Sequence, residues 1–404
     1  MPAISRKGQQ LPASPIRKLV PLAEEARRRG LKVYHLNIGQ PDISSPPEAF
    51  RPLKEFSQSF VDYSHSAGNM SYRQRLAEYY QSLGLPVEAH DILVTTGGSE
   101  ALMFTIMSCL DEGDEIIIPE PFYANYNSFS VASGCKVVPV NSRIEEGFAL
   151  PPLSEFERLI TPRTKAILIC NPSNPTGYLY SLEELATLAS IVEKHNLWLI
   201  ADEVYRDFVY DGHKHHSILE FESIAEQAVV VDSVSKRFNL CGVRVGCLIT
   251  RNKDLQATVL RFLQARLSPP SLGQLVAQAA LDTPPTYFED IRREYEQRRN
   301  FIVERLNTIP GVVCPKPGGA FYCMVRLPVA NAEDFCKFLL QDFSYHGCTV
   351  MLAPAAGFYA TPQKGLDQVR LAYVLKKEDL AVAADCLEEA LKVYPTHGFH
   401  SPGD

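Results

Sequence analysis

Short runs of apolar residues recur along the chain from about residue 90 onward, and helical stretches separate several of them. These runs are apolar throughout instead of alternating with polar residues, which is typical of strands buried on both faces of a sheet. Strands that alternate with helices form mostly parallel sheets. The pattern therefore predicts an α/β fold with a mostly parallel, seven-stranded sheet covered by helices. The seven runs are ILVTT (92–96), EIIIPE (115–120), KVVPV (136–140), AILIC (166–170), LWLIAD (197–202), VVVDSV (229–234) and VGCLIT (245–250).

The two ends of the chain predict a second, smaller α/β domain. The polar residues 1–12 predict a flexible arm, and Ser14-Pro15 predicts a helix that runs to about Arg29, with Gly30 ending it. We expect a large domain over residues 45–285, and a small domain formed by residues 1–44 and 286–404. The small domain should contain a helix within 287–311, apolar runs at 318–327, 348–354 and 369–375, and a final helix at 377–392.

Composition and charge narrow the class of protein. A chain of 404 residues with 46% hydrophobic and 22% charged residues is typical of a globular protein of two domains. The net charge of −7 argues against a nucleic-acid partner. The sequence contains neither a run of 18 apolar residues nor an apolar core near its start, so we expect no membrane span and no secretory signal. The ten cysteines form no CxxC pair, so we expect reduced thiols and a cytoplasmic protein.

Ligands of parallel sheets bind beyond the carboxyl ends of the strands, so we expect functional residues directly after each run. The first run is followed by Gly97, Gly98 and Ser99 at the start of a predicted helix. Backbone N–H groups at a helix start attract anions such as phosphate. Glycine turns before helices are nevertheless common, so this signal is weak by itself.

Two further runs end in polar loops. Residues 171–177 read NPSNPTG, and two Asn-Pro steps hold a loop away from helix, although a simple turn also favours these residue types. The run 197–202 ends in Asp202, which is followed by Glu203, Val204 and Tyr205. An acid at the end of a buried strand needs a cationic partner, such as a protonated pyridine nitrogen, unless it merely caps a helix.

The run 229–234 leads into Ser233, Ser235 and Lys236, and Arg244 follows eight residues after the lysine. A lone lysine is usually a solvated surface charge. This lysine lies between two apolar segments and near a second cation. Such surroundings lower the pKa of an amine, which can then attack an aldehyde as a nucleophile.

Taken together, these loops resemble the class I and II aminotransferases, which have fold type I of the enzymes that use pyridoxal 5'-phosphate (PLP). The resemblance extends from NIGQPD (37–42) to VRLAYVL (369–375). Its specific motifs are NPxNPTG, DExY and SxSKxxxxxGxRxG, which occur in the family's order. Among family members the chain most resembles the aspartate aminotransferase-like enzymes.

The resemblance implies a role for each residue that matches a motif. Lys236 would carry PLP as a Schiff base and later move the proton. Asp202 would pair with the pyridine N–H. Tyr205 and Asn174 would donate hydrogen bonds to the phenolic oxygen of the ring. On this reading Lys236, Asp202 and Tyr205 are the catalytic residues.

The remaining matches imply how phosphate and substrate are held. Ser233, Arg244 and the backbone of Gly98 and Ser99 would bind the phosphate, and Tyr123 would stack on the ring. Arg370 would clamp the substrate α-carboxylate near Asn174, and the backbone of Gly39 would lie over the substrate. Tyr63 would reach the phosphate of a partner subunit, which implies a homodimer.

The implied reaction is a ping-pong transamination between an amino acid and a 2-oxo acid, but the sequence leaves the substrate open. A dicarboxylate needs a second cation, and Arg17, Lys18, Arg261 and Arg266 are all candidates. Alternatively, Tyr63, Tyr123 and Tyr126 could line a pocket for aromatic substrates.

The sequence leaves two other functions open. A PLP-dependent lyase on the same fold, either a carbon–sulfur β-lyase or one similar to aminocyclopropane-carboxylate synthase, shares most of the cofactor site. A non-enzymatic regulator is disfavoured because Lys236, Asp202, Arg244 and Arg370 are all present. We expect no metal site, because His213, His215 and His216 lie in a turn-like stretch without ligands at the required spacing.

Overall fold

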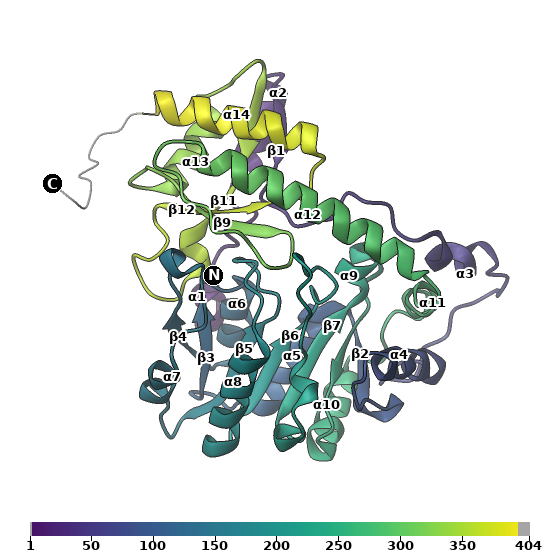
Figure 1. Ribbon diagram of the computed structural model, residues 1–404. Helices are drawn as coiled ribbons and strands as arrows, with labels where there is room; N and C mark the ends of the chain where they lie inside the picture. Colours follow the sequence, from purple (N-terminus) through teal and green to yellow (C-terminus); the bar gives the residue numbers. More distant parts are fainter. Residues whose placement is uncertain (1, 395–404) are drawn as a thin grey trace.

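The computed structural model describes residues 2–394 and is built around one seven-stranded sheet (Figure 1). The strands follow the order β2-β8-β7-β6-β5-β3-β4 across the sheet. Each of the seven apolar runs forms one of these strands, so the predicted α/β fold is confirmed. The strands are β2 (Ile92–Thr95), β3 (Glu115–Glu120), β4 (Lys136–Asn141), β5 (Thr164–Cys170), β6 (Trp198–Asp202), β7 (Ala228–Ser233) and β8 (Gly246–Ile249).

The sheet is parallel except at one strand. β8 runs antiparallel to both of its neighbours, β2 and β7, whereas β7, β6, β5, β3 and β4 pair in parallel. In β6 and β7 the register pairs Asp202 with Val231. The carboxyl ends of the parallel strands therefore meet at one edge, where side chains from several loops can converge.

Helices cover both faces of this sheet. Leu168 of β5 packs in the core that includes Leu102 of α5, whereas the neighbouring Ile167 packs in the core that includes Leu188 of α8. The alternation places α5 and α8 on opposite faces, as Figure 1 shows. The helices around the sheet are α4 (Met70–Ser82), α5 (Gly97–Cys109), α6 (Asn125–Ser133), α7 (Leu153–Leu159), α8 (Leu182–His195), α10 (Lys253–Ala265) and α11 (Ser271–Ala280).

Local sequence sets the ends of α8. The Ser181 hydroxyl accepts a hydrogen bond from the Glu184 N–H, and the Glu184 carboxylate accepts one from the Ser181 N–H. This reciprocal pair satisfies two backbone donors that a helix start leaves without partners. At the other end Asn196 adopts a left-handed conformation with φ of 51°, which stops the helix. The helix is thereby fixed between the loop after β5 and the start of β6.

Two smaller sheets lie above the large one in Figure 1. The first pairs β1 with β10 in parallel, and so joins an N-terminal segment to one more than 300 residues later. The second is antiparallel, in the order β11-β12-β9. The elements of this region are β1 (Lys32–His35), β9 (Tyr322–Arg326), β10 (Cys348–Met351), β11 (Ala353–Pro354), β12 (Gln368–Ala372), α2 (Val20–Arg28), α12 (Pro285–Asn307), α13 (Ala332–Gln341) and α14 (Lys377–Val393).

The N-terminal segment differs from the prediction. The structure has a short helix, α1 (Arg6–Gln10), within the predicted polar arm, and the helix expected from Ser14 begins only at Val20. Pro21 explains the later start. A helix beginning at residue 14 would hold Pro21 in its interior, where the ring clashes with the carbonyl of residue 17. In the first turn of α2 the missing N–H of proline has no cost.

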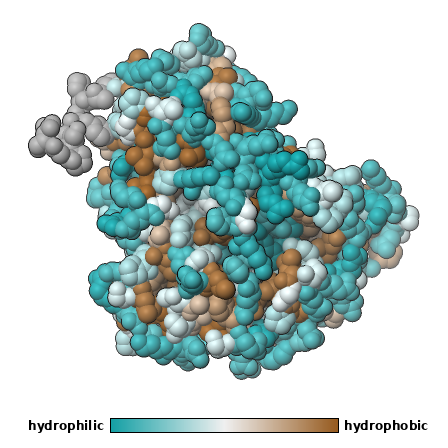
Figure 2. Space-filling view, in the orientation of Figure 1, coloured by the Kyte–Doolittle hydropathy of each residue, from teal (hydrophilic) through white to brown (hydrophobic). Residues whose placement is uncertain are grey.

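Short helices complete the described chain. They are α3 (Arg51–Lys54), α9 (Val234–Arg237) and the 3₁₀ turns at Pro47–Phe50, Ala89–Asp91, Ile144–Glu146, Ile218–Glu220, Glu222–Ile224, Cys241–Val243 and Ala355–Phe358. Figure 2 shows a face that is largely hydrophilic, with hydrophobic residues in separate patches. None of the helices among residues 2–394 has the length and apolar character that crossing a membrane requires.

Candidate active site

A cavity of about 630 Å³ lies at the carboxyl ends of the central strands. Side chains of the large sheet's loops line it together with residues of β9, β12 and the N-terminal segment. Of the twelve site residues expected from the sequence, all except Tyr63 line this cavity. They are Gly39, Gly98, Ser99, Tyr123, Asn174, Asp202, Tyr205, Ser233, Lys236, Arg244 and Arg370.

Lys236 lies in α9, directly after β7, and its side chain reaches into the cavity. Its Nζ donates a hydrogen bond to the backbone oxygen of Gly39 at 3.1 Å. Burial lowers the pKa of Lys236 to about 8, and the nearby charges of Arg370 and Arg244 act in the same direction. A substantial fraction of this amine is therefore neutral, and nucleophilic, near neutral pH.

Asp202 ends β6 and is buried beneath the cavity. Its Oδ2 accepts a hydrogen bond from the Tyr126 hydroxyl at 2.9 Å, and its Oδ1 accepts one from the Val204 N–H at 3.4 Å. Burial raises the pKa of Asp202 to about 6. Within residues 2–394, no Lys, Arg or His nitrogen lies within 4.0 Å of this carboxylate. The site thus holds a buried acid that lacks a cationic partner.

One end of the cavity is suited to a phosphate group. The N-terminus of α5 opens at Gly97, whose φ of +75° favours glycine. A Cβ atom at this position would lie 2.5 Å from Nη2 of Arg244, so glycine leaves room for the guanidinium at the helix start. The hydroxyls of Ser233 and Ser235 lie 2.8 Å apart beside it. Backbone donors, hydroxyls and a guanidinium form a typical phosphate-binding set.

Arg370 of β12 is 1% exposed. Its Nη1 donates to Oδ1 of Asn174 at 3.0 Å and its Nη2 to the backbone oxygen of Asn37, while its Nε has no partner in the described chain. The rings of Tyr322 and Phe358 lie 4.5 and 5.0 Å from the guanidinium carbon. No carboxylate of the described residues lies within 4.0 Å. A buried guanidinium without an acid can bind an anionic ligand.

Tyr322 is a cavity residue that the sequence did not reveal. Its hydroxyl lies 2.9 Å from the hydroxyl of Tyr205, and the two rings meet edge to face. A Cβ atom on Gly39 would lie 1.8 Å from the Tyr322 hydroxyl oxygen, which explains why position 39 holds glycine. Tyr322 follows an ordinary turn into a strand of the smaller sheet. No local motif could therefore have identified it, and only the sheet topology brings it to Tyr205.

Tyr123 and Tyr126 lie near each other but differ in role. Tyr123 lines the cavity, and its hydroxyl accepts a hydrogen bond from Nδ2 of Asn125 at 2.8 Å. Tyr126 is fully buried and faces Asp202. The suggestion that Tyr126 lines a pocket for aromatic substrates is therefore wrong. Tyr126 lies in the first turn of α6, which directs its side chain toward Asp202 and away from the cavity.

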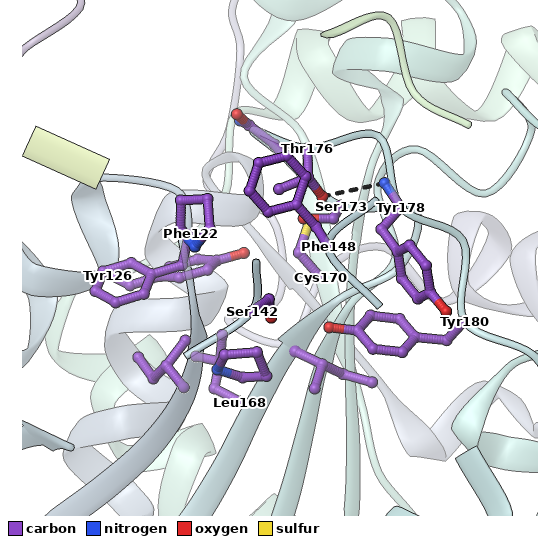
Figure 3. Close-up of a pocket in the computed structure, with 15 residues that line it drawn as sticks. Phe122, Tyr126, Ser142, Phe148, Leu168, Cys170, Ser173, Thr176, Tyr178 and Tyr180 are labelled. Carbon is purple, nitrogen blue, oxygen red and sulfur yellow. Dashed lines mark hydrogen bonds between the residues drawn. The ribbon is translucent and has the colours of Figure 1, made fainter. Parts of the chain in front are cut away.

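Figure 3 shows a second, much smaller cavity of about 10 Å³ behind the loop 171–177. Aromatic side chains that include Tyr126, Phe148 and Tyr180 surround it. The dashed line marks the hydrogen bond from the Tyr178 N–H to Oγ1 of Thr176, at 3.1 Å. This space holds about one water molecule. It is therefore part of the packing that fixes the Asn174 loop and has no room for a substrate.

A cluster of ion pairs joins the segment that follows Asp202 to the segment that contains Lys236. Arg237 donates from Nε to Oδ2 of Asp207 and, at 2.9 Å, from Nη2 to Oδ2 of Asp232. The Tyr80 hydroxyl and the Arg206 guanidinium lie 2.8 and 3.2 Å from the same Asp232 oxygen. Burial of Arg206, Arg237 and Asp232 is tolerable because the two cations face Asp232 and the partly buried Asp207. The cluster ties the segment after β6 to the segment after β7.

Tyr63 is the one expected site residue that lies outside the cavity. Its side chain is 79% exposed and lines a shallow depression with Thr96 and Pro270. The neighbouring Phe60 and Val61 are also exposed apolar residues. Tyr63 therefore lies outside the cavity that the expected phosphate-binding residues of its own chain line.

The chain is similar to known proteins over nearly its full length. The family model described as "Aminotransferase class I and II" matches residues 32–387. An aspartate aminotransferase of Geobacillus stearothermophilus is 32% identical over 380 residues, which cover 92% of this chain and 92% of that protein. Aromatic-amino-acid aminotransferase 2 of Thermococcus litoralis is 30% identical over 402 residues, covering 96% and 98%. The family match includes all of the expected site residues, from Gly39 to Arg370.

A solved structure shows the same fold. The aspartate aminotransferase from Thermus thermophilus, determined with maleate, superposes with a TM-score of 0.87 at 29% sequence identity. The match covers 96% of this chain and 100% of that one. Sequence and fold comparisons therefore agree, and they agree with the geometry of the cavity.

Proposed function

The chain belongs to the class I and II aminotransferases, and on that premise we propose a role for each charged group of the cavity. The protein is a PLP-dependent enzyme that moves an amino group between an amino acid and a 2-oxo acid. When bound, PLP supplies an electron sink for the substrate Cα as that carbon loses its proton. One observation supports the assignment most strongly. Asp202 and Arg370 are buried opposite charges, each without an oppositely charged partner within 4.0 Å among the described residues, and the amine of Lys236 lines the same cavity.

The cavity residues fit the three parts of the cofactor. The pyridine N–H would supply the cation that Asp202 lacks, and the carboxylate would keep that nitrogen protonated. Arg244 and Ser233, with the N–H groups of Gly98 and Ser99, would hold the phosphate at the start of α5.

The phenolic side of the ring would meet a different set of residues. The Tyr205 hydroxyl and the Asn174 amide would donate hydrogen bonds to the phenolic oxygen. Tyr123, at the cavity wall, would stack on the face of the ring. These contacts would orient the ring so that its aldehyde faces Nζ of Lys236.

The substrate end of the cavity is formed by Arg370, Asn174 and Gly39. Arg370 would bind the α-carboxylate with the donors that its protein contacts leave available, and the hydrogen bond to Asn174 would hold the guanidinium in place. The backbone of Gly39 would lie over the substrate. The neutral amine of Lys236 would accept the proton from the substrate Cα and return it at a neighbouring carbon, which is general base and acid catalysis by one residue.

The donor and the acceptor are proposed from the relatives. Similar proteins are named as aminotransferases of aspartate and of aromatic amino acids, so we expect an aspartate or broad-specificity aminotransferase. The test is to mix the PLP-loaded enzyme with single amino acids and record the spectral change of each half-reaction, and then to add 2-oxoglutarate. Transfer requires that the second step restore the starting spectrum. Release of pyruvate and ammonia without an acceptor would identify a lyase instead.

Tyr63 supports a proposal about assembly. We propose that the active unit is a homodimer in which Tyr63 contacts the phosphate bound by a partner subunit. Its 79% exposure beside the exposed Phe60 and Val61 supports this arrangement, because such apolar exposure is typical of a surface that another subunit covers.

We also propose the division into a large domain of residues 45–285 and a small domain of residues 1–44 and 286–404. The separate sheets support this division. It would place Lys236 and Asp202 on one domain and Arg370 and Gly39 on the parts that can close over a substrate. The ten cysteines, none of which forms a disulfide, support a reducing compartment such as the cytoplasm.

A further inference from the structure

We propose that Arg17 binds the second carboxylate of a dicarboxylic substrate, so that the enzyme prefers acidic amino acids and their 2-oxo acids. This inference rests on the proposed function, because it assigns the first carboxylate to Arg370. It adds a specificity-determining residue to the site, on a segment that no motif of the cofactor site includes.

The charges that line the cavity carry the argument. They are four basic side chains and one acid: Arg17, Lys236, Arg244, Arg370 and Asp202. Four of these charges have a proposed partner: Lys236 the aldehyde, Arg244 the phosphate, Arg370 the α-carboxylate and Asp202 the pyridine nitrogen. Arg17 has none. The basic charge of Arg17 therefore exceeds what the cofactor and a simple amino acid require. A second carboxylate on the substrate would neutralise it.

The structure also ranks the four cations that the sequence left as equal candidates. Lys18 forms an ion pair with Glu333, outside the cavity. Arg266 forms an ion pair with Glu100 at 3.2 Å and donates to a backbone oxygen. Arg261 lies on the exposed side of α10 and does not line the cavity. Within residues 2–394, Arg17 alone of the four lines the cavity, and it forms no ion pair with the acids described.

Arg17 is held at a defined place relative to Arg370. The amide of Asn37, which is 0% exposed, donates from Nδ2 to the backbone oxygen of Ile16 at 2.7 Å. The backbone oxygen of the same Asn37 accepts a hydrogen bond from Arg370. One buried residue thus connects the two arginines. The backbone next to Arg17 is therefore anchored to the residue that Arg370 binds, which limits the separations that the two guanidinium groups can adopt.

A packing contact holds the segment before Arg17, and a charge effect relates Arg17 to Tyr123. Pro15 packs on Gly357, where a Cβ atom would lie 2.7 Å from the proline Cβ. Burial raises the pKa of the Tyr123 hydroxyl. The positive charge of Arg17 is close enough to lower the same pKa and so partly offsets that effect. Arg17 and Tyr123 therefore line the same cavity, close enough for their charges to interact.

Because Arg17 is exposed at the mouth of the cavity, its interaction with an anion is partly screened by water. A loss of about tenfold in dicarboxylate binding is the expected effect of removing its charge. A surface arginine without a role in recognition would show no such loss, and an arginine that only shapes the cavity would affect all substrates alike.

The test compares the PLP-loaded wild type with Arg17→Gln and Arg17→Lys. The matched control is Arg261→Gln, which makes the same charge change on the surface. The probes are succinate and butyrate, non-reacting acids of equal chain length that differ in one carboxylate. We expect Arg17→Gln to weaken succinate binding about tenfold, with butyrate binding unchanged. Arg17→Lys should recover part of the loss, and Arg261→Gln should match the wild type.

Kinetics provides the second measurement. In Arg17→Gln, kcat/KM for aspartate or glutamate should fall about tenfold, while kcat/KM for alanine or phenylalanine stays within about twofold. Equal losses for both classes, no loss, or a wild type that binds succinate no better than butyrate would each overturn the proposal. Failure of the proposed function would be a different result, because then no donor of either class would transfer nitrogen. The succinate measurement would still decide the role of Arg17, since binding requires no turnover.

Discussion

Arg370 donates a hydrogen bond from Nη1 to Oδ1 of Asn174 at 3.0 Å, and this contact joins β12 of the small antiparallel sheet to the loop after β5 of the large one. The two residues are 196 positions apart in the chain. The contact holds the guanidinium that would bind the substrate α-carboxylate against the loop that would also touch the cofactor. Under the proposed function, substrate binding and cofactor orientation would both depend on this pair of side chains.

The first prediction concerns this arginine. Arg370→Lys keeps the charge but loses the planar fork, so binding of the α-carboxylate should weaken by about 2–4 kcal/mol in the transition state. The loss should occur with every amino acid, because all share this carboxylate. A plain amine donor should be affected little, and the affinity for PLP should be unchanged. Kinetics with one amino acid and one plain amine checks this, and equal losses for both would assign Arg370 a structural role.

The second prediction concerns Asp202. Asp202→Asn preserves the shape of the side chain but removes the charge that would hold the pyridine nitrogen protonated. We expect the half-reaction with an amino acid to slow roughly thousandfold, while PLP still binds. Single-turnover spectra measure the rate. Glu222→Gln removes an exposed carboxylate far from the cavity and serves as the control. A rate near that of the wild type in Asp202→Asn would refute the pairing.

The third prediction is a pH dependence of cofactor capture. Only the neutral form of the Lys236 amine attacks an aldehyde, and burial lowers its pKa from 10.5 to about 8 in the cofactor-free protein. The rate of PLP capture should therefore rise with pH up to about 8 and then level off. Rapid-mixing absorbance measures this rate. Reaction of PLP with N-acetyl-lysine corrects for titration of PLP itself. A corrected rate that still rises steeply above pH 9 would mean that the amine is not shielded from water.

The fourth prediction concerns the proposed dimer. Mixing Lys236→Ala with Tyr63→Phe subunits should give hybrids in which one site lacks both residues and the other is intact. Activity should then exceed that of either parent. If mass spectrometry detects the hybrid and activity does not recover, Tyr63 serves its own chain or none.

Residues that follow the strands of the large sheet could be predicted from the sequence. Lys236 and Asp202 could be found because an apolar run ends directly before each of them, and strand ends of parallel sheets converge. Arg370 was expected at the substrate because of its motif, and the structure places it in the cavity.

The contacts between distant segments could not be predicted. Tyr322 and Asn37 carry no local signal, because their roles arise from the packing of the small sheet against the large one. Tyr126 was one of three tyrosines suggested for an aromatic pocket, and its burial against Asp202 could not be predicted because only the packing of α6 on the sheet produces it. Pro21 could have corrected the start of α2, because a proline in a helix interior is disfavoured.

The central claim is that Lys236 is the residue that binds PLP covalently, and borohydride reduction tests it most directly. Reduction of the holoenzyme followed by proteolysis and mass spectrometry should place one pyridoxyl group on the peptide that contains Lys236. The same treatment of Lys236→Ala should give no adduct on that peptide. A pyridoxyl group on a different lysine of the wild type, or on none, would contradict the account.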